Sequence, residues 1–216
     1  MIRLRPVAAA LAIAALTAGC GAKTPDYQSI WAKDGAVTTT AQPSEEDLLS
    51  VGRYLESKGV TAVAVAPGEV PDLTVSIPTP PGWSKRENAQ LPKTTQVIGK
   101  GETFPSAVLT VLRLDGDFDP AETVKHGLAE AQQLQNFTLL DASTGDFNGF
   151  PSSVVQGNHD LNGQRVHSWF RMVIPTVQPS GQRYLVQLAI MTLAEQAAKQ
   201  AGDAESIMNG FTVKAK

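Results

Sequence analysis

The sequence is poor in the residues that most often carry chemistry. It has one cysteine and three histidines in 216 residues, and aromatic residues make up 6% of the chain. A single cysteine excludes a disulfide within the chain and the cysteine clusters of structural zinc sites. Neither sign of charge dominates, because 18 lysines and arginines stand against 21 aspartates and glutamates. Without a basic excess, the composition does not favour nucleic acid as a partner.

Long hydrophobic runs are also missing, and the run from Val7 to Leu16 is too short to cross a bilayer. Its length suits the core of a signal peptide, and two arginines precede it. Small residues then lead directly to Cys20, although Thr17 stands where a larger apolar residue is usual. This pattern resembles a bacterial lipobox, in which the cysteine is acylated and the chain is cut just before it. An ordinary cleaved signal and an uncleaved anchor are the alternatives.

The composition divides the chain into three parts. We expect a signal peptide over residues 1–19, a lipidated Cys20 with a flexible tether over 20–43, and one globular domain over 44–216. The tether is rich in threonine, alanine and proline and has no apolar period. Tyr27 and Trp31 interrupt it, which leaves open a short docking element.

Three helices are predicted from their end signals. Ser44 precedes three acidic residues and predicts a helix over 45–58, closed by a glycine. Asp119 followed by a proline predicts a second helix over 120–135, with Glu122 reaching back to its start. Thr192 is interpreted as the cap of a C-terminal helix that ends at residue 210.

The strands follow from residues that alternate between apolar and polar, and from turn signals. Three strands are expected near 73–77, 94–98 and 106–114, and four more near 137–147, 150–159, 165–175 and 182–192. Asn148-Gly149 and Asn162-Gly163 are the turns of two hairpins. The order α-βββ-α-ββββ-α predicts an α/β (α+β) fold, a three-layer α/β/α sandwich with a largely antiparallel sheet.

The histidines do not predict a metal site. If Asn162-Gly163 is a two-residue turn, His159 and His167 point to opposite faces of the sheet. The same register sets Asp160 opposite Arg165 as a cross-strand ion pair. His126 is expected at the edge of the second helix.

Other candidate motifs also have structural explanations. The alternating aspartates from Asp115 to Asp119 resemble a calcium loop, but Pro120 and His126 stand where a glycine and a carboxylate are needed. They are better read as a strand-to-helix loop that ends in a cap. The glycines of 99–103 lack the spacing of a phosphate-binding loop, and no G-x-S-x-G motif is present. The sequence predicts no catalytic residue, no cofactor and no metal, and hence no enzyme.

Three segments carry a family resemblance: residues 72–83, 146–153 and 182–188. They are similar to the LpqN/LpqT-type lipoproteins of mycobacteria. The resemblance implies a PsbP-like fold, with an antiparallel sheet between helices. It also implies a lipoprotein anchored on the outer face of an actinobacterial membrane and sometimes shed to the extracellular space. The family brings no catalytic residues.

The leading hypothesis is a monomeric, non-enzymatic binding or interaction module whose partner is a protein or an envelope glycolipid. The alternative is a carrier or chaperone for an apolar envelope molecule, with Trp83, Phe150 and Trp169 lining a pocket. These aromatic residues could equally fill the core. A hydrolase is the third hypothesis.

Overall fold

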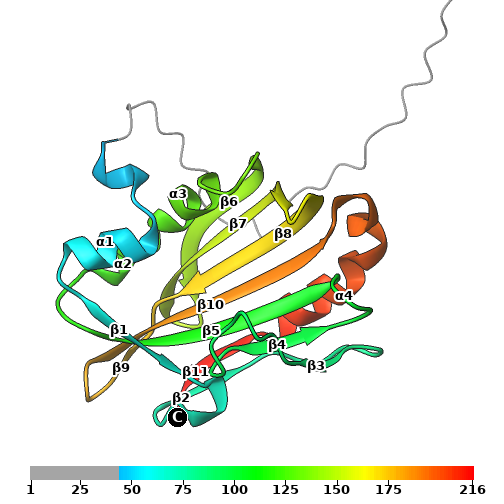
Figure 1. Ribbon diagram of the computed structural model, residues 1–216. Helices are drawn as coiled ribbons and strands as arrows, with labels where there is room; N and C mark the ends of the chain where they lie inside the picture. Colours follow the sequence, from blue (N-terminus) through cyan, green and yellow to red (C-terminus); the bar gives the residue numbers. More distant parts are fainter. Residues whose placement is uncertain (1–43) are drawn as a thin grey trace, which may run out of the picture. The chain divides into compact units, whose positions relative to one another are not determined.

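The computed structural model describes residues 44–216, and a large antiparallel sheet forms their centre (Figure 1). The sheet runs in the order β3-β4-β5-β10-β8-β7-β6, with β1 paired to β5 and β9 paired to β10. Its strands are β1 (Thr61–Val65), β3 (Ser84–Arg86), β4 (Gln96–Gly99), β5 (Ser106–Asp115), β6 (Thr138–Phe147), β7 (Phe150–Leu161), β8 (Gln164–Val173), β9 (Thr176–Val177) and β10 (Gln182–Leu193). A second, two-stranded sheet pairs β2 (Leu73–Ser76) with β11 (Thr212–Ala215).

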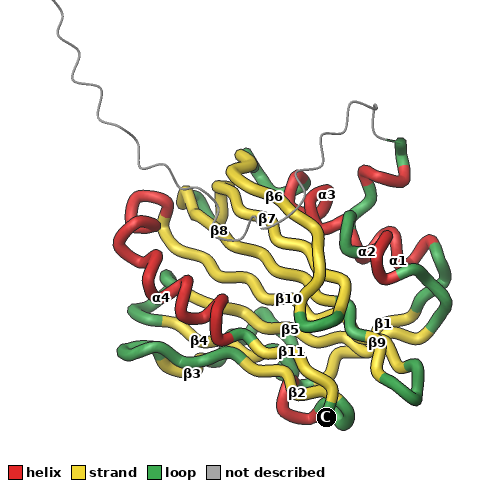
Figure 2. The backbone as a smooth tube through the Cα atoms, turned by 180° about the vertical axis from the view of Figure 1, so that it is seen from behind, coloured by secondary structure: helices red, strands yellow, loops and turns green. Residues whose placement is uncertain are grey.

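Helices cover both faces of the main sheet (Figures 1 and 2). The first face carries η1 (Glu46–Leu48), α1 (Val51–Ser57), α2 (Pro120–Thr123) and α3 (His126–Gln132). The second face carries α4 (Ala197–Gly210), which follows the short η3 (Ala194–Gln196); η2 (Pro67–Glu69) leads into β2. The predicted three-layer α/β/α sandwich with an antiparallel sheet is therefore confirmed, and its architecture is the one expected from the PsbP-like resemblance.

Neighbouring side chains of β8 show how the two faces are separated. Met172 faces α3, with its methyl group close to Gly127. Arg171 points the other way, and its guanidinium lies 4.7 Å from the ring of Phe147. That ring stacks on Phe211, directly after α4, at 5.3 Å. The helices α3 and α4 therefore pack on opposite faces of the sheet.

Both predicted hairpins are confirmed. The asparagine and glycine of each turn have positive φ angles, 51° and 76° at Asn162 and Gly163, as a type I′ turn requires. Leu161 pairs with Gln164, so the register is the predicted one. Asp160 also forms its ion pair with Arg165, at 3.1 Å.

The predicted helices are shorter than expected. The helix over 45–58 is wrong as a single element, because Leu49 adopts an extended conformation between η1 and α1. Ser44 does cap the first turn, since its Oγ lies 3.3 Å from the Asp47 backbone nitrogen. The helix over 120–135 is divided into α2 and α3. Thr192 is not a cap, because β10 continues to pair with β8 through residue 193.

Several strands were not predicted: β1, β3, β9 and β11. The strand near 73–77 exists as β2, but it pairs with β11 and not with the main sheet.

A buried cluster joins α1 and α2 to the first face of the sheet. Its members are Val51, Leu55, Val60, Leu114, Phe118, Val124, Met172, Ile174 and Leu185.

Candidate functional site

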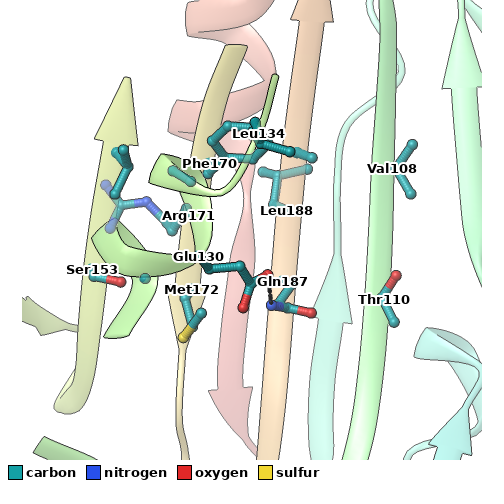
Figure 3. A pocket seen from close by; sticks show the side chains of 14 residues that line it. Val108, Thr110, Glu130, Leu134, Ser153, Phe170, Arg171, Met172, Gln187 and Leu188 are labelled. Atoms are coloured by element: carbon teal, nitrogen blue, oxygen red, sulfur yellow. Dashed lines mark hydrogen bonds between the residues drawn. The ribbon is translucent and has the colours of Figure 1, made fainter. Parts of the chain in front are cut away.

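A pocket of about 210 Å³ lies between α3 and the first face of the sheet (Figure 3). Leu134, just beyond α3, and Phe170 of β8 form an apolar end. Glu130 of α3 and Gln187 of β10 meet at the other end, and β5 forms the far wall. The pocket thus combines an apolar half with a small polar half, which is the usual composition of a binding site.

The position of α3 creates this hollow. Gly127 lets the helix approach β7 very closely, because a Cβ atom there would lie 2.6 Å from the Oγ of Ser153. The helix therefore packs over β6 and β7. It does not fully cover the side chains that β10 and β5 present on the first face. Ala189, Gln187 and Val108 remain half-buried as a result and line the pocket.

Glu130 is the one acidic residue that lines the pocket, and its side chain is half-buried. Gln187 Nε2 donates to its Oε1 at 3.4 Å, and the Val51 backbone N–H donates to the carboxylate. Burial raises the pKa of Glu130, and these two hydrogen bonds partly oppose that effect. Within residues 44–216, no lysine, arginine or histidine forms an ion pair with this carboxylate.

The histidines lie outside the pocket. The expected edge position of His126 is wrong, because its ring is buried, stacks on Tyr54 at 4.0 Å and has Nδ1 3.0 Å from the Leu49 carbonyl oxygen. His159 and His167 do lie on opposite faces, as the register requires. Over residues 44–216, no group of three or more histidine, aspartate or glutamate side chains is arranged to hold a metal ion.

The loop from Asp115 to Asp119 is a helix start, as predicted. Asp119 Oδ1 accepts from the Ala121 and Glu122 backbone nitrogens at 2.8 and 3.4 Å. Glu122 does not reach back to the start of the helix; its carboxylate instead pairs with Lys125 at 2.6 Å. The aspartates are thus used in capping and surface pairs.

The three aromatic residues expected at a pocket do not line this one. Trp83 donates from Nε1 to Asp203 of α4 at 2.9 Å, and Trp169 lies against His167 on the second face. Phe150 begins β7 at the hairpin. The aromatic residue in the pocket is Phe170, one position after Trp169, and alternation along β8 places the two on opposite faces.

The remaining predicted site, Cys20, and the tether residues Tyr27 and Trp31 lie outside the described residues. None of the helices within residues 44–216 has the length and apolar character needed to cross a membrane.

Residues 48–214 match a protein-family model described as "Probable lipoprotein LpqN". The chain belongs to the LpqN lipoprotein family. It is 50% identical to the LpqT lipoprotein of Mycobacterium tuberculosis H37Rv, over 99% of this chain and 96% of that relative. It is 47% identical to LpqT of Mycobacterium leprae, over 99% and 97% of the two chains. The LpqN family relationship predicted from the sequence is confirmed, and it places the chain among cell-envelope lipoproteins.

A solved structure also supports the fold. The crystal structure of LpqN, described as involved in cell envelope biogenesis of M. tuberculosis, superposes with a TM-score of 0.66. It is 21% identical in sequence and covers 77% of this chain and 98% of the LpqN chain. At that identity the likeness shows a shared LpqN fold.

Proposed function

We propose that this protein is a lipid-anchored, non-enzymatic binding module on the outer face of the cell membrane. In this proposal residues 1–19 are removed, Cys20 carries the lipid, and residues 20–43 tether a monomeric domain over 44–216. Membership of a lipoprotein family supports the anchor. The involvement of LpqN in cell envelope biogenesis supports a role in the same compartment.

The observation that carries the binding role is the pocket beneath α3. Its walls are mostly apolar side chains, with a few polar groups gathered at one end. Its volume of about 210 Å³ is below the range of about 300–1,000 Å³ that encloses a whole drug-sized ligand. It therefore suits one apolar group of a larger partner better than a complete apolar molecule, which favours recognition over carriage.

A small probe can test whether the pocket binds. Nα-acetyl-norleucine N-methylamide presents one unbranched apolar side chain, and the ¹³C-labelled methyl group of Met172 reports from the pocket wall. We expect a saturable shift of the Met172 methyl resonance, with the Met208 methyl, buried in α4, unchanged. Absence of a saturable Met172 shift would contradict the proposal.

A matched pair of variants makes the test specific. Ala189→Leu fills the pocket from β10 and should abolish the shift. Ala201→Leu makes the same change at another half-buried alanine, on α4, and should leave binding intact. If both variants bind the norleucine probe equally well, the probe binds at a site other than this pocket.

The anchor has a separate test. Intact-mass measurement of the membrane-extracted protein should find a chain that begins at Cys20 and carries acyl groups. Cys20→Ser should lose that mass and move the protein from the membrane fraction to the soluble one. An unmodified wild-type cysteine would refute the anchor without affecting the pocket.

A further inference from the structure

Glu130 is an unusual residue to find in this pocket. A half-buried carboxylate is costly unless a cation or several hydrogen bonds compensate it. Two donors reach it, from Gln187 and the Val51 backbone. A neutral glutamine carbonyl could accept the same two hydrogen bonds, so they do not by themselves explain the negative charge.

Basic side chains near the pocket are engaged elsewhere. Arg171 of β8 lines the pocket, but its guanidinium lies on the second face, 4.7 Å from the Phe147 ring. Lys58, just after α1, pairs with Glu46 at 2.8 Å, and Lys125, before α3, pairs with Glu122 at 2.6 Å. Arg183 of β10 lies 3.5 Å from an aspartate of the loop before α2. Among the described residues, the charge of Glu130 therefore has no internal counter-ion.

The arrangement of the pocket indicates what could supply the cation. Leu134 and Phe170 lie together at one end, and the carboxylate of Glu130 lies at the other, beside Gln187 (Figure 3). A ligand group that fills both ends needs an apolar stem and a positively charged tip. A lysine side chain has this form, because four methylene groups carry a terminal ammonium.

We propose that the pocket selects a lysine side chain of a partner protein, whose stem lies between Leu134 and Phe170 and whose ammonium pairs with Glu130. The inference rests on the proposed function, since it takes the pocket as the binding site. It goes further by stating that the recognised group is positively charged. The volume of about 210 Å³ suits a single side chain and favours a protein over a lipid as the source of the cation.

The test compares two probes that differ in charge. Nα-acetyl-lysine N-methylamide and its norleucine counterpart share the apolar stem, and only the first carries the ammonium. They are titrated against the full chain in phosphatidylcholine nanodiscs, with the Met172 methyl resonance as the readout. We expect the lysine probe to bind at least about tenfold more tightly, because hydrogen bonds between charged groups are the strong ones.

Variants at Glu130 connect the preference to the carboxylate. Glu130→Gln should remove the lysine preference, so that the two probes bind with equal affinity, while Glu130→Asp should retain part of the preference. Glu122→Gln removes the same charge from an exposed residue outside the pocket and should keep the full preference. The Met208 methyl resonance verifies that each variant is folded.

The outcomes separate the two proposals. Equal affinity of the probes for the wild-type chain would overturn the lysine proposal and leave the apolar pocket in place. A lysine preference that survives in Glu130→Gln would overturn the role of the carboxylate. No Met172 shift with either probe would overturn both proposals. Nanodiscs that contain phosphatidylethanolamine add a primary lipid ammonium, which donates hydrogen bonds as a lysine does and as the choline group of phosphatidylcholine cannot. Displacement of the lysine probe by these nanodiscs would assign the site to a lipid headgroup and overturn the protein source.

Discussion

Acid is expected to destabilise the domain through His167 on β8, a residue that is 7% exposed. Its Nδ1 lies 2.7 Å from Asn158 Oδ1, and its Nε2 lies 3.0 Å from Gln156 Nε2. The neutral ring can donate to the first and accept from the second, whereas a proton on Nε2 would face the amide hydrogens of Gln156. Burial lowers the pKa of His167 to about 4.

The size of the effect follows from the two protonation equilibria. The unfolded chain titrates near the ordinary histidine pKa of about 6.5, and the folded chain near 4. Between these values the unfolded state binds more protons, so stability is full above pH 6.5 and is lost as the pH falls toward 4. At about 1.36 kcal/mol per pH unit, the complete shift corresponds to about 3 kcal/mol, and about 1.4 kcal/mol is lost by pH 5.5.

Urea unfolding of the wild type and of His167→Gln at pH 7.5 and 4.5 measures this loss. Glutamine keeps a donor and an acceptor but does not titrate. Carboxylates such as Asp160, whose pKa is lowered by hydrogen bonds from Asn136 and Arg165, also weaken the fold in acid. These carboxylates weaken the wild type and the His167→Gln variant equally, so their effect cancels in the comparison. The wild type should lose about 2.5 kcal/mol more than the variant, and an equal loss in both would refute the reasoning.

Three further predictions concern stability and are measured by the same urea unfolding. Gly127→Ala should lower the free energy of unfolding by about 1–3 kcal/mol, because its Cβ would overlap the Ser153 hydroxyl. Adding Ser153→Ala should recover most of that loss, and no recovery would show that this overlap is not the cause. Asp119→Ala should cost about 1 kcal/mol, since two backbone N–H groups of α2 lose their acceptor; an unchanged midpoint would refute the cap. Asp203→Ala should cost about 1–3 kcal/mol by leaving the buried Trp83 N–H without a partner, and an equal cost in a Trp83→Phe background would show that this bond is not the cause.

Local chemistry explains what could be predicted from the sequence. The register of β7 and β8 follows from Asn162-Gly163 alone, because a two-residue turn fixes every pair that follows. The cap at Asp119 is equally local. The break after η1 has no such local signal: the Leu49 carbonyl oxygen at the break contacts the His126 ring, far along the chain.

The pocket could not be predicted for the same reason. Glu130 and Gln187 come from α3 and β10, and only the order of strands in the sheet brings them together. Trp169 was the more conspicuous candidate, yet Phe170 lies in the pocket, because a difference of one residue in a strand reverses the face. The alternation of apolar and polar residues defines two faces but does not tell which face a helix will leave partly uncovered.

The pairing of β2 with β11 has a consequence for the order in which the domain folds. Val75 pairs with Val213, which lies 138 residues further along the chain, whereas β7 and β8 are joined by a two-residue turn. Closing so long a loop is slow compared with forming a hairpin. The central hairpins should therefore acquire protection from hydrogen exchange first, and the small sheet should close over the second face last.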